Sequence, residues 1–431
     1  MRLIHCFLGL LIVFQTLSQN TLSISGKVVD QETEELLPFA TVGVKGSPYG
    51  TITNADGAFT FFLPASYLND TLSVSYVGFE TYKVVINKVT EGHLAVALRE
   101  QVVVLEQVEV NVEQLTGKQI IQRALDKLKE NYSNKPCVLK GFFRDIREQN
   151  GETVYLEDAV VDVQDIGVSM PRKFFLKGVR ASNSRIHTLL SEYFLTTRNF
   201  LSLNVGHNYW INYLKHNVRK KEFIIADIIT KNDNAFYVIT TTETISKEVL
   251  AEEYKDLSYT LTHRYLVNCE TFAIHKIEHL EDPTKGKYTG IEPPYEGDTL
   301  FHSKKGWNLV IEFEEYQGKM YLKYHDASYA FDIVDKKNDR IFLEMKYQFV
   351  FMVTDIETDT SKKPSGEKMN RNRPLSLQTE GYDRGFWEDL DNARLMPLTQ
   401  KQIKDLEKYQ PLKAQFQSNK TQHKKNVDQD L

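Results

Sequence analysis

The sequence predicts a mixed fold, in which an N-terminal all-β sandwich is followed by an α+β domain with a curved antiparallel sheet. Three observations lead to this prediction. Short apolar runs broken by turn residues fill residues 21–112, a capped amphipathic pattern begins at Thr116, and long alternating segments dominate residues 138–354. Apolar–polar alternation is typical of strands with one buried face, and a meander of such strands beside a few helices makes an α+β domain.

The first residues have the layout of a secretory signal peptide. Arg2 precedes an apolar run over residues 7–14, and Thr16 and Ser18 follow it. The run is shorter than the ~18 apolar residues that a membrane-spanning helix needs, and no later segment reaches that length. We therefore expect residues 1–19 to be removed and the mature protein to be exported without a transmembrane helix.

Residues 26–100 show the pattern of a small β-sandwich. Runs rich in Val, Ile, Thr, Phe and Tyr are separated by Gly, Pro and Asn-Asp turn signals. Residues 54–57 read Asn-Ala-Asp-Gly, in which polar side chains can bond nearby backbone N–H groups and Gly57 can adopt a positive φ. This motif predicts a tight hairpin turn.

Several spaced motifs in this block resemble one known module. They are GKVVD at 26–30, LLPFATVGVKG at 36–46, GTITNADGAFT at 50–60 and VSYVGF at 74–79. Together they resemble the carboxypeptidase-regulatory-like domain, a transthyretin-like sandwich at the front of many Gram-negative envelope proteins. The resemblance implies an accessory domain over residues 21–112 that has no catalytic residues of its own, in a protein of the cell envelope.

A helix is predicted to follow the sandwich. Thr116 and Gln119 have the spacing of a capping box, in which each side chain bonds the backbone of the other. The apolar residues that then fall on one helical face are Ile120, Ile121, Ala124, Leu125 and Leu128. We expect this face to dock on the second domain, at residues 115–400.

Strand patterns dominate the second domain. They cover residues 138–147, 153–164, 174–179, 223–230, 235–245, 257–267, 271–280, 309–314, 319–334 and 341–354. Long antiparallel strands twist and curl, so we expect an open half-barrel with an apolar concave face. The segment Ser184–Leu214, which has apolar residues at helical spacing, is expected to lie across its mouth. Either a bound acyl chain or these helical segments alone would cover the concave face.

The same region resembles a second group of proteins. The motifs are NYS at 131–133, KGFFR at 140–144, YLEDAVV at 155–161, TFAIHKIE at 271–278 and FWED at 386–389. They resemble the body of envelope proteins that carry this N-terminal sandwich, and the middle region is similar to the half-barrels of lipoprotein carriers. These motifs are packing patterns, so no functional residue follows from them.

Composition and motifs exclude several function classes. The net charge of −5 and the pI of about 6.2 leave no electrostatic footprint for nucleic acid. The sequence has no Cys-x-x-Cys, no Gly-x-Ser-x-Gly, no phosphate-binding glycine loop and no His-Glu-x-x-His. We therefore expect a protein that is not an enzyme and has no catalytic residues, cofactor or metal.

Two histidine patterns in the sequence are candidate metal sites. His275 and Glu278 stand three apart on a predicted strand, so they point to opposite faces unless a bulge intervenes. By the same alternation His275, His279 and Glu281 share one face, but such residues are more often structural than metal-binding. We expect all four to be structural.

The cysteines leave one question open. Cys6 lies in the predicted signal peptide, and Cys137 and Cys269 remain. In an oxidising compartment they can form one disulfide, and two separate buried thiols are equally compatible with the sequence.

The C-terminal part is predicted to be mostly irregular. Residues 362–374 are polar and read as a linker, and residues 399–409 read as a small capped helix. Residues 410–431 are rich in Gln and Lys and are predicted to form a disordered tail.

Three function classes fit these observations. The first is a non-catalytic exported protein of the periplasm or outer membrane that binds a lipid, a glycan or a partner envelope protein. The second is a structural or interaction module of an outer-membrane uptake or export assembly, and the third is a hydrolase whose site has no recognisable motif. We adopt the first, with peripheral association at the outer membrane.

Overall fold

The structure is a computed structural model in which most of both predicted domains is described. The described residues are 21–37, 40–44, 50–53, 56–76, 79–87, 92–100, 115–167, 172–186, 210–231, 234–245, 258–285, 300–335, 340–370, 375–378, 385–387, 396 and 398–418. The predicted signal peptide at 1–19 and residues 101–112, at the end of the predicted sandwich domain, lie outside these residues.

Residues 21–98 form a sandwich of two sheets around one core. The strands are β1 (Thr21–Asp30), β2 (Thr41–Val44), β3 (Gly50–Ile52), β4 (Ala58–Pro64), β5 (Thr71–Ser75), β6 (Tyr82–Val85) and β7 (Gly92–Leu98). Among the described residues one sheet has the order β4-β1-β7 and the other β3-β2-β5-β6. Val28, Val42, Phe59, Leu72 and Val96 point inward and are almost fully buried, so alternation along each strand produces the core that the sequence predicts.

The predicted hairpin at residues 54–57 is wrong in one respect. Gly57 has the expected positive φ, 66°, and a Cβ built there would lie 2.6 Å from the carbonyl oxygen of Val28. However, β3 pairs with β2, whereas β4 pairs with β1 in the other sheet. The chain therefore crosses here from one sheet to the other, which local turn chemistry does not reveal.

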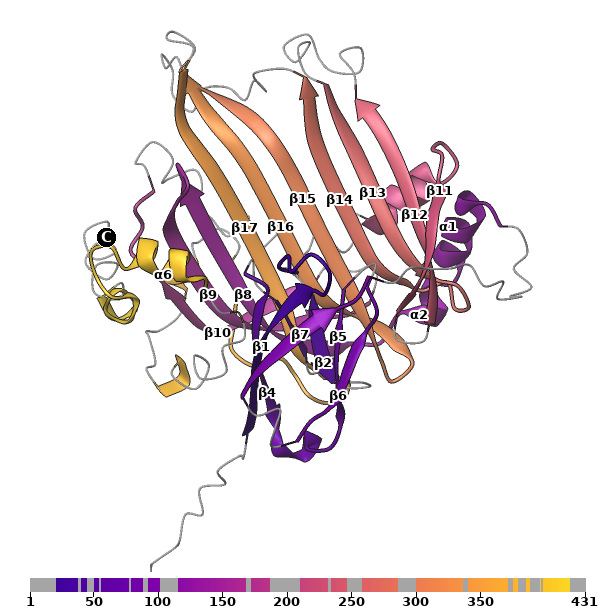
Figure 1. Cartoon of the computed structure of the whole chain (residues 1–431), viewed down its shortest axis with the longest axis horizontal. Coiled ribbons are helices and arrows are strands. Elements are labelled where there is room, and N and C mark those ends of the chain that lie inside the picture. The colour runs from indigo at the N-terminus through magenta and orange to yellow at the C-terminus, as the bar shows by residue number, and fades with distance from the viewer. Residues whose placement is uncertain are drawn as a thin grey trace, which may run out of the picture.

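The second domain is built on one large antiparallel sheet (Figure 1). Its strands are β8 (Cys137–Gln149), β9 (Glu152–Asp165), β10 (Lys173–Ala181), β11 (Ile224–Lys231), β12 (Asn234–Ile245), β13 (Ser258–Asn268), β14 (Ile274–Lys285), β15 (Leu300–Tyr316), β16 (Lys319–Asp335), β17 (Arg340–Glu357) and β18 (Glu367–Lys368). In the described part of the chain their order is β11-β12-β13-β14-β15-β16-β17-β8-β9-β10-β18. The chain thus makes β8–β10, crosses to the far edge at β11, and returns strand by strand until β17 pairs with β8.

The sheet is curved, as the sequence predicts. Figure 1 shows the long strands β15–β17 bending and the sheet turning between its two ends. Register shifts, which locally bend and twist a strand, occur near Leu176, Ile225, Leu266, Lys304 and Glu312. The concave and convex faces carry separate sets of buried side chains.

Helices cover part of the concave face. Helix α1 (Gly117–Asp126) begins with the predicted capping box, in which both hydrogen bonds between Thr116 and Gln119 are present. Helix α2 (Leu128–Asn131) follows it directly. The described end of the predicted mouth segment, residues 210–217, is also helical and places Trp210, Ile211 and Leu214 in the same core; its residues 187–209 lie outside the described part.

The C-terminal region covers the convex face near β8–β10. Helix α6 (Gln400–Leu406) has a capping box at Thr399, which agrees with the predicted capped helix. The predicted disorder from residue 410 is wrong for residues 410–418, because 412–418 are helical and Phe416 packs with Ile146, Leu156 and Leu406. Two apolar side chains in a polar sequence, Phe416 and the partly buried Leu412, dock this segment on an existing apolar patch.

Candidate ligand-binding face inside the curved sheet

One continuous apolar core lines the concave face. It joins inward side chains of nearly every long strand, among them Phe143, Val161, Ile239, Ile311 and Phe331, which are at most 1% exposed. The same cluster includes the inner faces of α1 and residues 210–217. The concave side is therefore the largest apolar surface that the described residues share.

A charged group lies within this apolar surface. The guanidinium of Arg147 is 2% exposed and bonds the carboxylate of Asp145, with Nη2 2.6 Å from Oδ2. The rings of Tyr155 and Tyr347 lie on the guanidinium, each with its centroid 5.1 Å from Cζ. These contacts balance the charge with one carboxylate and two aromatic faces. Nη1 of Arg147 is buried and has no hydrogen-bond partner among the described residues.

Glu157 adds a second buried carboxyl group to the cluster. Burial, and then the charge of Asp145, raises the pKa of Glu157 to about 7. The backbone N–H of Ser376 donates to its Oε1 at 3.0 Å, so the segment after β18 reaches this part of the sheet. Arg147, Asp145 and Glu157 thus form a compact polar cluster in an apolar concavity. We call it the Arg147 cluster.

The Arg147 cluster is absent from the sequence predictions. Phe143, Asp145 and Arg147 alternate on β8, so two charges follow an inward aromatic residue there. Tyr155 and Glu157 alternate on β9, where one charge does so. The sequence therefore does contain a signal for the cluster, because these charged residues stand at the alternating strand positions that the core residues also occupy. However, Arg144 and Asp158 occupy the opposite parity, and the sequence does not show which parity faces the concavity.

A histidine pair lies farther along the concave face. His279 Nδ1 and His263 Nε2 are 2.8 Å apart, and both rings are buried. Tyr213 stacks on His263 with centroids 4.3 Å apart, and Trp307 packs on His279 at 4.5 Å. Burial, reinforced by His279 and Lys221, lowers the pKa of His263 to about 3. The His263 ring is therefore uncharged near neutral pH.

The structure places the four candidate metal ligands, His275, Glu278, His279 and Glu281, differently from the prediction. A register shift leaves His275 as an extra residue on β14, because Val267 pairs with Ile274 and Leu266 pairs with Lys276. The expectation that His275 shares a face with His279 and Glu281 is therefore wrong: His275 lines the convex side, and His279 lies in the concave core. His275 and Glu278 fall on the same face instead. Within the described residues no group of three or more His, Cys, Asp or Glu residues could hold a metal ion.

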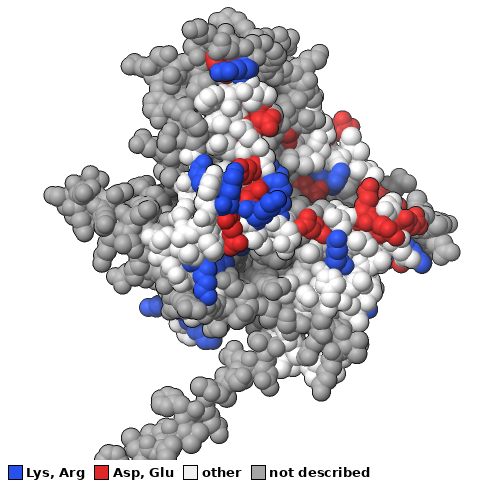
Figure 2. Space-filling view, turned by 60° about the vertical axis from the view of Figure 1, so that its left-hand side comes forward, with Lys and Arg blue, Asp and Glu red and all other residues white. Residues whose placement is uncertain are grey.

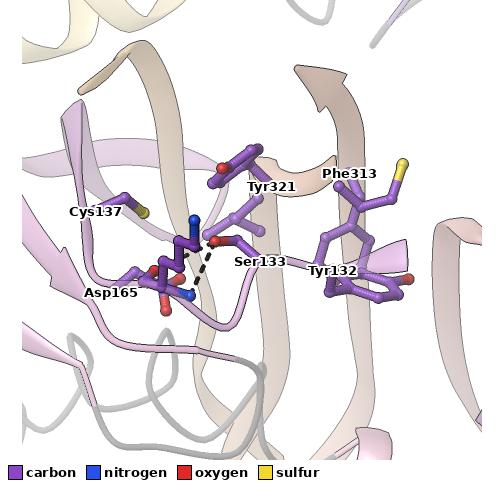
Figure 3. Close-up of a pocket in the computed structure, with 9 residues that line it drawn as sticks. Tyr132, Ser133, Cys137, Asp165, Phe313 and Tyr321 are labelled. Atoms are coloured by element: carbon purple, nitrogen blue, oxygen red, sulfur yellow. Dashed lines mark hydrogen bonds between the residues drawn. The ribbon is translucent and has the colours of Figure 1, made fainter. Parts of the chain in front are cut away.

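A small pocket lies at one end of the concave core (Figure 3). Figure 3 shows Cys137 and Asp165 on one side and Tyr132 and Phe313 on the other, with Ser133 between them. The volume is about 10 Å³, which is room for a single water molecule. Burial, and then Asp165, raises the pKa of Cys137 to about 12, so its thiol is inert.

The cysteine question has an answer in the described residues. Cys137 and Cys269 are free thiols, the first buried and the second half-buried. Of the two alternatives that the sequence left open, the structure therefore has the separate thiols.

The outer surface carries charges of both signs. On the face in Figure 2, Lys and Arg side chains lie among Asp and Glu side chains rather than in one broad basic area. In the described part of the chain, no helix combines the length and the apolar character required to cross a bilayer.

Several solved structures are similar to parts of this chain. A LolA superfamily protein from Nitrosomonas europaea is 12% identical, covers 56% of this chain and 93% of its own, and has a TM-score of 0.22. A domain from Vibrio parahaemolyticus, described as a putative outer membrane lipoprotein-sorting protein domain, is 9% identical. The match covers 57% of this chain and 95% of that domain, with a TM-score of 0.27. A membrane-associated protein of unknown function from Bacteroides fragilis is 10% identical, with coverages of 78% and 98% and a TM-score of 0.15.

No curated protein matches the sequence. The family comparison is more definite for the N-terminal sandwich, because residues 24–110 match the family model of the CarboxypepD_reg-like domain, as the sequence motifs predict.

Proposed function

We propose that this protein is an exported, non-catalytic binding protein of the Gram-negative cell envelope that holds an amphiphilic ligand against the concave face of its sheet. Because the residues of the concave core are almost fully buried, its acyl part would enter between the sheet and the helices packed on it, and its polar part would lie beside Arg147. Envelope location is supported by the signal-peptide pattern of residues 1–19 and by the N-terminal module.

The observation that carries this proposal is the Arg147 cluster inside an apolar concavity. Ligand sites are mostly apolar and contain a few polar groups that fix orientation. A buried N–H without a partner costs free energy, and a ligand oxygen on Nη1 would remove that cost. Since Asp145 already balances the guanidinium charge, the oxygen that fits best is uncharged, such as an ester or amide carbonyl.

The test is to identify lipid in the purified protein. The full chain is purified from the periplasm or envelope without detergent, and organic extracts are examined by mass spectrometry. We expect a stoichiometric lipid. In the double variant Arg147→Met/Asp145→Leu, which removes both charges together, we expect about tenfold weaker retention, equivalent to one hydrogen bond of roughly 1.4 kcal/mol.

The control is Arg264→Met, on the convex side, which should retain lipid like the wild type. If the wild type carries no stoichiometric lipid and gives no fluorescence gain with a hydrophobic probe, the proposal fails. The second function, an interaction module of an outer-membrane assembly, would then be preferred. It is favoured by the packing of α1 and residues 210–217 into the concave core, and its measurement is a pull-down from solubilised envelopes.

A further inference from the structure

A cleft lies between the sandwich and the convex face of the large sheet. Its volume is about 360 Å³, within the range of small-molecule sites. On the sandwich side, Val42 and Leu72 point into the sandwich core, so their neighbours Thr41, Gly43 and Ser73 point outward into the cleft. The outer face of the β2–β5 pair thus lines the cleft with the hydroxyl groups of Thr41 and Ser73, and the Ser73 hydroxyl donates to the Gly43 carbonyl oxygen at 3.1 Å.

The opposite wall is a set of paired charges on the large sheet. The Nζ atom of Lys276 lies 2.9 Å from Glu278 Oε1 and 3.4 Å from Glu312 Oε1. Lys323 pairs with Glu314 at 2.8 Å. Burial lowers the pKa of Lys276, but Glu312 and Glu278 outweigh it, so the pKa is raised and the ammonium stays charged.

One of these groups also joins the two domains. The hydroxyl of Thr41 donates to Glu312 Oε2 at 3.3 Å. Glu312 therefore binds Lys276 with one oxygen and the sandwich with the other, so it links the two sides of the cleft.

The third wall is apolar. Phe236 and Leu266 belong to a small buried cluster on the convex face, and the ring of His275 meets the ring of Phe236 edge to face, with centroids 4.9 Å apart. The bulge on β14 is what turns His275 toward this side. The cleft therefore combines hydroxyl groups, fixed carboxylates and an aromatic edge.

We infer that this cleft binds one or two sugar rings of a neutral oligosaccharide. An ionic ligand would have to displace a partner from one of the ion pairs, whereas a neutral polyol can bond both partners and leave each pair intact. Hydroxyl and carboxylate oxygens accept hydrogen bonds from the many donors of a sugar, and Phe236 and Leu266 give the cleft an apolar wall for the C–H groups of a sugar ring. This site is independent of the acyl site proposed inside the sheet.

The test is titration of the mature full chain with neutral trisaccharides (maltotriose, cellotriose and chitotriose) by calorimetry and saturation-transfer NMR. Trigalacturonate serves as the anionic counterpart. We expect at least one neutral trisaccharide to bind, and to bind better than trigalacturonate. Ser73→Tyr, which fills the cleft from the sandwich surface, should weaken binding at least about tenfold, and Phe236→Leu should weaken it by removing the aromatic edge from the apolar wall.

The matched control is Ser66→Tyr, on an exposed part of the sandwich away from the cleft, which should bind like the wild type. Thermal unfolding shows whether each variant is folded. The inference is overturned if no neutral trisaccharide binds, or if trigalacturonate binds equally well or better. It is also overturned if the folded Ser73→Tyr variant binds as the wild type does. Lipid retention is measured on the same variants and should not change, so the two proposals fail separately.

Discussion

Asp158 shows how one residue holds the convex side of the sheet near β8–β10. Its side chain is fully buried between Arg144, with Nε 2.8 Å from Oδ1, and Arg180, with Nη2 3.0 Å from Oδ2. The guanidinium of Arg180 also lies 4.5 Å from the ring of Trp387 and 4.8 Å from that of Phe416. Burial alone would raise the pKa of Asp158, but the two arginines outweigh it and the pKa is lowered.

Asp158→Asn should therefore destabilise the protein by about 3–5 kcal/mol, because two buried guanidinium groups lose their shared carboxylate. Since the folded pKa of Asp158 lies below its unfolded value, its contribution is complete above about pH 4 and is lost as pH falls further. Urea unfolding between pH 7 and pH 3 should show a flatter pH dependence for the variant than for the wild type.

The matched control is Asp355→Asn, in the half-exposed pair with Lys140. It should cost less than about 1 kcal/mol. Equal losses in the two variants would contradict the view that burial, rather than pairing alone, makes Asp158 important.

The docking of the C-terminal helical segment, residues 412–418, depends mainly on the ring of Phe416. Phe416 is 7% exposed and packs with Ile146, Leu156 and Leu406, while Gln415 donates to the Leu406 carbonyl at 2.8 Å. Phe416→Ala should cost about 3–5 kcal/mol and should increase amide exchange in α6. The neighbouring Lys413→Ala is the control, and hydrogen exchange that remains at the wild-type level in Phe416→Ala would contradict this docking.

Elements with strong local signals could be predicted from the sequence. The capping box at Thr116 and the alternating strands of residues 138–354 depend on near neighbours, so their pattern survives in the fold. The first half of β15, from Leu300, was missed because its sequence FHSKKGW does not alternate and contains the bulge near Lys304. The face of His275 was wrong for the same reason, since a bulge adds one residue without any local sequence mark.

At the scale of the whole molecule, the two cores are separate. Phe59 is buried in the sandwich core and Phe331 in the core of the large sheet. Calorimetry of the full chain should therefore show two transitions. Phe59→Ala should lower the temperature of one transition and Phe331→Ala that of the other, because each substitution destabilises its own domain by about 3–5 kcal/mol. One transition that both variants shift equally would mean that the domains unfold as a unit.

The arrangement of the domains and the candidate sites lay beyond sequence prediction. The cleft needs Thr41 and Glu312 to meet across 271 positions of the chain, and the Arg147 cluster needs β17 beside β8. Neither contact leaves a periodic signal in either segment. A curved sheet was predictable because curvature follows from strand twist, whereas strand order depends on which edges meet.

The seam between β8 and β17 has a consequence for the time course of folding. Lys140 and Asp355, which pair across it at 2.6 Å, are 215 positions apart. Closing so large a loop carries a high entropic cost, and pairing of distant strands is slow. Until β17 is in place, β8 keeps one open edge with unpaired backbone groups, a template for strands of other chains. The β8–β17 pair at the centre of the finished sheet therefore forms late in folding. Until then, the open edge of β8 is the part of the nascent chain most prone to aggregate.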